Sequence, residues 1–144
     1  MVKPQHILIP NHDGLADASR PVVSELPQAS KVVSIEDGAQ MVMAFVKIVS
    51  RETTPSLVVL DHRLGRVQGR SCAMAIRAIE RGLGIPKTPI LFYTAEPADD
   101  EFKRFTSGLG QTLQLTRRMD KSIGSQARRL GKAVNRILEK VARS

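Results

Sequence analysis

Short apolar runs alternate with longer stretches of helical period along this 144-residue chain. The clearest run is Leu57-Val58-Val59-Leu60, which contains no polar position and ends at Asp61. A strand that is apolar on both faces is typical of a parallel sheet with helices on each side. The alternation therefore predicts an α/β fold built from successive strand and helix units.

Five segments have the length and composition of strands, and prolines and glycines mark the connections. They are residues 6–10, 31–34, 57–60, 89–93 and 112–115. Between them, residues 39–50 and 71–81 place their apolar side chains on one stripe, as helices that face a sheet do. Another helix is expected near residues 15–26, where Pro21 would interrupt it unless the helix begins late.

The C-terminal part of the chain is strongly basic. Nine of the 22 Lys and Arg lie in residues 117–144, which hold only two acids, so this part carries most of the formal net charge of +8. A last helix over about residues 125–142 would be amphipathic, with apolar and basic side chains on opposite sides. The apolar side comprises Ala127, Leu130, Val134, Ile137, Leu138 and Val141, and the basic side comprises Arg128, Lys132, Arg136, Lys140 and Arg143. Such a basic face suits an acidic protein, a nucleic acid or an anionic membrane surface.

The length is typical of one domain, and we expect residues 1–144 to form a single folding unit. Cys72 is the only cysteine, so it cannot form an internal disulfide, which favours a reducing compartment. The apolar runs are far shorter than the roughly 18 residues of a membrane span. We therefore expect a cytoplasmic protein with no membrane span.

Polar residues follow the candidate strands at the points where the strands end. Asp61 follows the third strand, Thr94 and Ala95 end the fourth, and Lys121 comes shortly after the fifth. Because the carboxyl ends of parallel strands surround the binding crevice, a carboxylate, a hydroxyl and an ammonium would converge there. This set suits acceptance of a phosphoryl group: the carboxylate is the nucleophile, the hydroxyl hydrogen-bonds a phosphoryl oxygen, and the ammonium neutralises charge.

In their order and spacing, these residues resemble the receiver domain of bacterial response regulators. The resemblance is carried by residues 57–64 with Gly69, by residues 89–95, by Lys121 and by Asp37-Gly38. It implies a flavodoxin-like, chemotaxis-type fold with five parallel strands in the order 2-1-3-4-5 and helices on both faces. It also implies Asp61 as the phosphoacceptor, with Thr94, Ala95 and Lys121 as the phosphoryl-binding and switch residues.

The same resemblance implies a Mg²⁺ site beside Asp61, formed with acids after the first strand and with the backbone carbonyl of Arg63. Asn11 and His12 stand where the family has two adjacent acids, and Asp13 follows one position late. Since Mg²⁺ prefers carboxylate and water oxygens in octahedral array, we expect the remaining ligands to bind it much more weakly. An alternative is a transition metal held by His12 together with Asp13 and Asp61, because imidazole suits Zn²⁺ or Ni²⁺.

The resemblance implies a stand-alone receiver domain in two-component phosphorelay signalling, acting by protein contact and not as an enzyme. Its partners would be a histidine kinase or phosphotransfer protein and a downstream protein target, with a homodimer also open. The alternative, motivated by Asn11-His12, is a pseudo-receiver that associates with partners independently of phosphorylation. A third hypothesis is a basic nucleic-acid-binding adaptor. One Tyr, four Phe and no Trp offer few stacking platforms for bases, which disfavours this third hypothesis.

Overall fold

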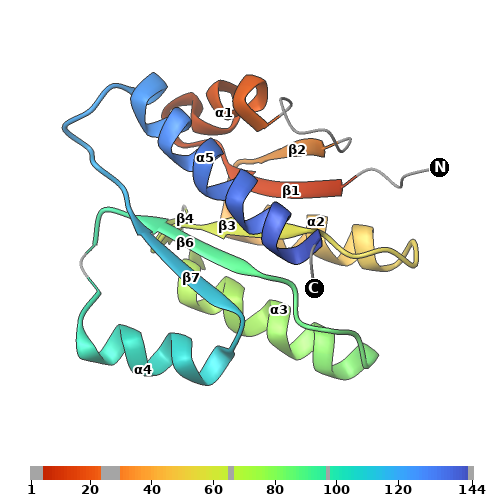
Figure 1. Cartoon of the computed structure of the whole chain (residues 1–144). Helices are drawn as coiled ribbons and strands as arrows, with labels where there is room; N and C mark the ends of the chain where they lie inside the picture. The colour runs from red at the N-terminus through yellow and green to blue at the C-terminus, as the bar shows by residue number, and fades with distance from the viewer. Residues whose placement is uncertain (1–4, 24–29, 65–66, 97, 143–144) are drawn as a thin grey trace.

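The computed structural model describes residues 5–23, 30–64, 67–96 and 98–142. In chain order, the elements are β1 (Gln5–Pro10), η1 (His12–Gly14), α1 (Leu15–Val23), β2 (Ser30–Ile35), α2 (Gly38–Val49), β3 (Leu57–Leu60), β4 (Arg63–Leu64), β5 (Val67–Gln68), α3 (Gly69–Leu83), β6 (Ile90–Thr94), α4 (Asp100–Leu109), β7 (Thr112–Thr116) and α5 (Ile123–Ala142). Figure 1 shows these elements in space.

Five strands form one parallel sheet in the spatial order β2-β1-β3-β6-β7. When only the strands of this sheet are counted, the order is 2-1-3-4-5, so the predicted topology is confirmed. β4 and β5 form a separate antiparallel hairpin directly after Asp61. This hairpin was not predicted from the sequence, since two strands of two residues each have no periodicity to detect.

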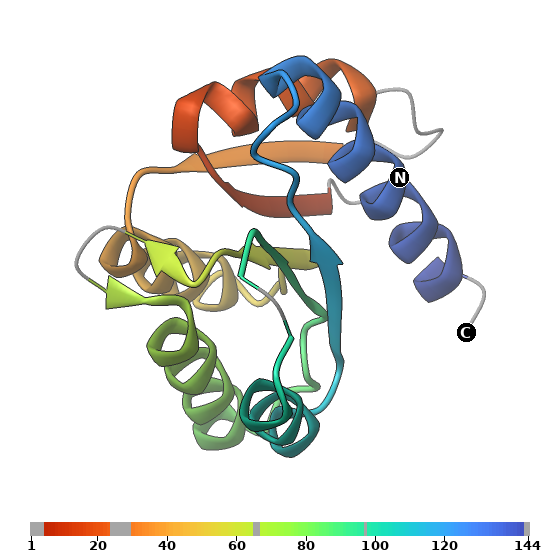
Figure 2. The ribbon, with the colours of Figure 1, turned by 90° about the vertical axis from the view of Figure 1, so that its left-hand side faces the viewer.

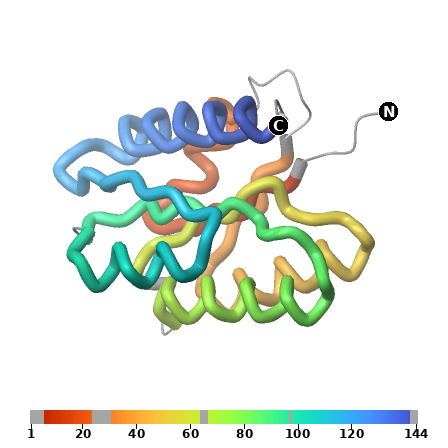
Figure 3. The backbone as a smooth tube through the Cα atoms, turned by 60° about the horizontal axis from the view of Figure 1, so that its bottom comes forward, coloured from red at the N-terminus to blue at the C-terminus, as the bar shows by residue number. Residues whose placement is uncertain are grey.

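Helices cover both faces of the sheet, as predicted. α1 and α5 lie on one face, while α2, α3 and α4 lie on the other (Figures 1 and 3). Successive side chains of a strand point to opposite faces, so Ile7 and Ile9 join the core under α1 and α5 while Leu8 joins the other core. This two-sided burial is the reason why the strands read as uninterrupted apolar runs.

α1 is not interrupted by its proline. It begins at Leu15, and Pro21 lies inside it. The helix packs so closely on α5 that a Cβ at Gly131 would lie 2.3 Å from Cγ1 of Val22. A proline inside a helix normally lowers the stability of that helix. In α1, the residue that follows the proline packs tightly on α5. The predicted residues 24–26 of this helix lie outside the described residues.

Over its described residues, α5 has the predicted amphipathic pattern with one exception, and Arg143, predicted on the basic side, lies outside them. Leu130, Val134 and Leu138 are buried, whereas Arg128 and Lys132 are exposed. Val141 was expected on the buried side, but 47% of it is exposed, since the end of the helix extends beyond the packed core. Within the described ranges, no helix has the length and hydropathy needed to cross a membrane.

Cys72 lies in α3, and its free thiol is fully buried in the core between this helix and the sheet. Its Sγ donates a hydrogen bond to the carbonyl oxygen of Gly38 at 3.4 Å. Burial, assisted by the carboxylate of Asp37, raises the pKa of Cys72 to about 11. The thiol is therefore protonated at neutral pH, and its role is packing.

A buried ion pair lies at the end of α3. Nη1 of Arg77 lies 2.6 Å from Oε1 of Glu80, and each side chain is only 2% exposed. Arg77 also donates through Nε to the Leu109 carbonyl at 3.1 Å and through Nη2 to the Gly110 carbonyl at 2.8 Å. Oε2 of Glu80 accepts the Thr88 amide at 2.5 Å. The pair thus connects α3 to the segment before β6 and to the turn between α4 and β7.

Replacing Arg77 with methionine should strongly destabilise the protein, because Glu80 would remain buried without its cation. We expect Arg77→Met to lower the free energy of unfolding by about 3–5 kcal/mol in urea titrations followed by circular dichroism. The control is Arg81→Met, which changes an exposed position of the same helix and should cost under about 0.5 kcal/mol. Equal urea midpoints for the two variants would contradict this account.

His6 should make the stability of the protein depend on pH. Burial, together with the charges of Lys31 and Arg51, lowers the pKa of His6 below its ordinary value of 6.5. The unfolded chain therefore binds a proton that the folded chain resists, so stability declines as pH falls through 6.5. We expect Tm to fall less between pH 7.5 and 5 in His6→Gln than in the parent protein. Parallel pH profiles would refute the assignment.

Candidate functional site

The carboxyl ends of the five parallel strands and the loops that follow them lie at one edge of the sheet, which faces the viewer in Figure 2. Asp61 is the first residue after β3, and its side chain is 19% exposed. It lines a depression of about 310 Å³. The other lining residues are Arg63, Thr94, Ala95, Glu96, Arg117 and Met119. The buried strand thus delivers a carboxylate to the position where parallel sheets form their binding sites.

Thr94 and Ala95 bring β6 to the same depression. Thr94 is fully buried, and its Oγ1 accepts a hydrogen bond from the Glu96 amide at 3.3 Å. A hydroxyl that accepts one hydrogen bond can still donate another, in this case to a group bound in the depression. Ala95 is exposed and contributes only a methyl group, which leaves space beside Asp61. The structure therefore brings together three of the predicted site residues.

The cation beside Asp61 is Arg117 and not the predicted Lys121. Arg117 is the first residue after β7, and its Nη1 lies 3.4 Å from Oδ2 of Asp61. Lys121 lies four residues further along, is exposed, and lines a different depression next to Tyr93 and Arg129. The prediction took the lysine that the family pattern requires.

Arg117 is held in place from several directions. Its backbone amide donates to the Thr94 carbonyl at 2.8 Å, and its Nε donates to Oε1 of Gln126 at 2.6 Å. Gln126 in turn donates from Nε2 to the Lys121 carbonyl at 2.9 Å. The hydroxyl of Tyr93 donates to the Gln126 carbonyl at 2.9 Å. The guanidinium is thus fixed between β6, β7 and the first turn of α5, with only 3% of its side chain exposed.

Gly69 allows the chain to turn beneath Asp61. Its amide donates to the His62 carbonyl at 2.9 Å. A Cβ at this position would lie 2.0 Å from the carbonyl oxygen of Asp61, a backbone atom that cannot easily move away. Only glycine fits this close approach. The hairpin of β4 and β5 therefore closes directly on the first turn of α3.

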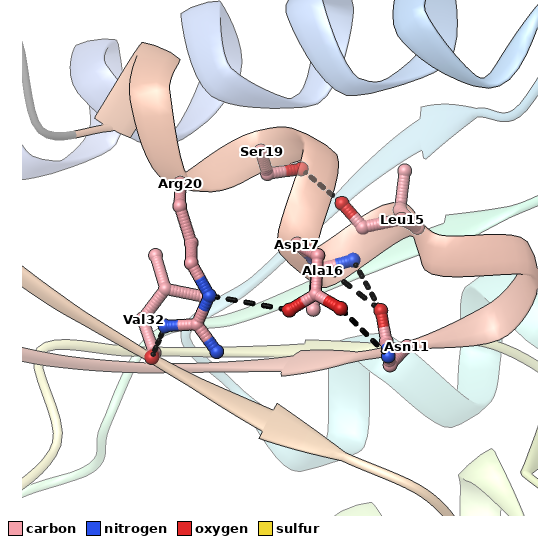
Figure 4. A network of polar contacts seen from close by, with 7 residues as sticks. All are labelled: Asn11, Leu15, Ala16, Asp17, Ser19, Arg20 and Val32. Atoms are coloured by element: carbon pink, nitrogen blue, oxygen red, sulfur yellow. Dashed lines mark hydrogen bonds and ion pairs between the residues drawn. The ribbon is translucent and has the colours of Figure 1, made fainter.

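The segment after β1 does not supply the predicted metal ligands. Oδ1 of Asn11 accepts the amides of Ala16 and Asp17 at 3.1 and 3.3 Å, so Asn11 caps α1 (Figure 4). Asp13 is exposed and is not among the residues that line the Asp61 depression. Nε2 of His12 is buried with no hydrogen-bond partner among the described residues.

A magnesium ion needs several oxygen ligands around one position. Within the described ranges, no three His, Cys, Asp or Glu side chains lie close enough to hold a metal ion. Asp13 does not line the Asp61 depression, so the predicted set of Asp13, Asp61 and the Arg63 carbonyl does not supply two carboxylates there for Mg²⁺. The same finding argues against the His12, Asp13 and Asp61 site for a transition metal.

A second cluster borders the site on the side of α4. The His62 ring lies 4.6 Å from the Phe102 ring, centroid to centroid. The Arg70 guanidinium lies over Phe102 and Phe105, at 5.5 and 5.4 Å from the ring centroids. Arg70 also pairs with Glu101 at 3.3 Å. These contacts dock α4 against the start of α3 and leave Arg70 engaged in stacking.

Comparison with solved structures identifies the fold. No protein-family model matches the chain, and no curated protein matches it in sequence. The phosphorylated cyanobacterial phytochrome response regulator RcpA superposes with a TM-score of 0.71 at 15% identity, over 98% of this chain and 96% of that one. The receiver domain of the histidine kinase CKI1 from Arabidopsis thaliana, complexed with Mg²⁺ and BeF₃⁻, gives 0.70 at 13% identity, over 92% and 89%. The Vibrio cholerae chemotaxis protein CheY4 gives 0.61 at 15% identity, over 95% and 99%. The chain therefore has the fold of response regulator receiver domains.

A side chain at Gly69 should disrupt the site, because its Cβ would overlap the Asp61 backbone. We expect Gly69→Ala to lower the free energy of unfolding by about 1–3 kcal/mol in urea titrations. Gly82→Ala is the matched control, since Gly82 lies in the same helix and a Cβ added there would meet nothing within 4 Å. That variant should gain about 0.5–1 kcal/mol from higher helix propensity. The same sign of change in both variants would contradict the close approach.

Proposed function

We propose that this chain is a receiver-type signalling domain that accepts a phosphoryl group on Asp61 and acts through protein contact. The observation that carries the proposal is the composition of one depression: a carboxylate, a buried hydroxyl, a small neighbour and a fixed guanidinium. These groups are suited to binding and accepting a phosphoryl group. The receiver fold supports the proposal, and Arg117 takes the role that was predicted for Lys121.

The donor would be a phosphohistidine on a histidine kinase or a phosphotransfer protein. An oxygen of Asp61 forms a bond to phosphorus while the bond from phosphorus to the imidazole nitrogen breaks. The released nitrogen takes up a proton from solvent, and Asp61 becomes an acyl phosphate. Arg117 donates to the phosphoryl oxygens in a charge-assisted hydrogen bond, and the Thr94 hydroxyl donates to another.

The new charge would be transmitted to α5. Arg117 holds Asp61 with one side of its guanidinium and Gln126 with the other. Adding a phosphoryl group to Asp61 moves the strongest attraction for Arg117 away from its present position. Because Gln126 belongs to the first turn of α5, a shift of the guanidinium changes the contacts of that turn. A downstream protein target that reads α5 would detect the phosphorylated state.

A second candidate is a pseudo-receiver that signals without phosphorylation. Two observations favour it: Asn11 is occupied as a helix cap, and Asp61 already has a cation as partner. In that case, the Asp61–Arg117 pair would hold one permanent arrangement for a binding partner. The two candidates differ in a single measurable property, which is whether Asp61 becomes phosphorylated.

Incubation with acetyl phosphate should add one phosphoryl group to the protein, as measured by intact mass spectrometry. We expect this adduct in the parent protein and in Asp13→Asn, because Asp13 is exposed and lies outside the depression. Asp61→Asn should form none, since an amide is not a nucleophile towards phosphorus. Absence of the adduct from the parent protein, with Mg²⁺ present or absent, would leave the pseudo-receiver as the function.

A further inference from the structure

The guanidinium of Arg117 has one donor that the protein does not use. Nη1 lies beside Asp61 and Nε donates to Gln126, but Nη2 is buried with no hydrogen-bond partner among the described residues. A buried charged donor without an acceptor is costly, and native proteins satisfy nearly all such groups. Because Arg117 lines the Asp61 depression, an anion bound there could supply the missing acceptor oxygen.

The depression already holds as many cationic as anionic side chains. Two carboxylates, Asp61 and Glu96, and two guanidinium groups, Arg63 and Arg117, line it. A divalent cation between Asp61 and a phosphoryl group would have to bind next to the buried positive charge of Arg117. Coulomb repulsion at such short range opposes this binding, and the described segment after β1 brings no further acids to the depression to offset it.

We propose that Arg117 supplies the positive charge that a divalent cation would otherwise provide, so that Asp61 takes up a phosphoryl group without a metal ion. This inference rests on the proposed function and concerns the same site. Nη1 stays on the carboxylate while Nη2 donates to a phosphoryl oxygen. One planar guanidinium thereby aligns the nucleophile and the electrophile. Lysine could not do this from a single fixed position, because an ammonium lacks the planar fork.

The surroundings of Arg117 fit this role. The guanidinium is held by Gln126 and the backbone by Thr94, so the guanidinium lies next to Asp61 before the phosphoryl group arrives. Donors that are fixed in advance stabilise developing charge more effectively than mobile ones. The Thr94 hydroxyl and the exposed Ala95 border the same space.

The test is acyl phosphate formation with and without a divalent metal. The parent protein is incubated with acetyl phosphate in excess EDTA, and separately in excess Mg²⁺, and the adduct is followed by intact mass spectrometry. We expect initial rates within about twofold of each other. An adduct on Asp61 that forms only with Mg²⁺ would overturn the inference and leave the proposed function standing. Absence of the adduct in both conditions would overturn both.

Arg117→Lys separates the role of Nη2 from that of charge alone. We expect the rate in EDTA to fall about tenfold or more, because one charge-assisted hydrogen bond is lost. Arg118→Lys is the matched control, because Arg118 is adjacent and exposed but lines the depression next to Tyr93 and Lys121. We expect this variant to form the acyl phosphate in EDTA at the rate of the parent protein. Equal rates in the two variants would overturn the inference.

A measurement on the parent protein covers the case in which Arg117→Lys fails to fold. Beryllium fluoride mimics an acyl phosphate, and it is added to ¹⁵N-labelled protein in EDTA while the Nε–H resonance of Arg117 is followed by NMR. We expect that resonance and the Ala95 amide to shift. If the Arg117 Nε–H and Ala95 amide resonances shift only after Mg²⁺ is added, the inference is overturned.

Discussion

The interaction between Asp61 and Arg117 organises the carboxyl edge of the sheet. It joins the end of β3 to the end of β7 across β6, and Arg117 extends it to α5 through Gln126 and to β6 through the Thr94 carbonyl. A carboxylate at this position needs a partner because it is mostly buried. The partner here is a side chain of the protein itself, Arg117.

The two buried arginines of the described residues show how differently one side chain can be used. Arg77 donates to four backbone carbonyls and to Glu80, so every side of its guanidinium is satisfied. Arg117 leaves Nη2 without an acceptor among the described residues. The first arrangement stabilises the fold at the amino end of β6. The second lies at the opposite end of the sheet and leaves one donor beside the Asp61 depression without an acceptor.

Most of the fold could be predicted because it follows from patterns that a single sequence displays. Buried parallel strands are apolar throughout, so residues 57–60 and their neighbours identified the sheet, and the strand ends identified Asp61 and Thr94. Lys121 was predicted from its resemblance to the family pattern, whereas the structure places Arg117, the first residue after β7, beside Asp61. The cap made by Asn11 and the hairpin of β4 and β5 could not be predicted, since both depend on contacts that have no periodicity.

The close contact between Gly131 and Val22 has a mechanical consequence. Because the two helices touch without side-chain space between them at this point, sliding of α1 past α5 would cause steric overlap. Gln126 lies near one end of α5, and the Asn11 cap begins α1. The contacts of Arg117 with Gln126 therefore connect the Asp61 depression to the packed pair of helices α1 and α5.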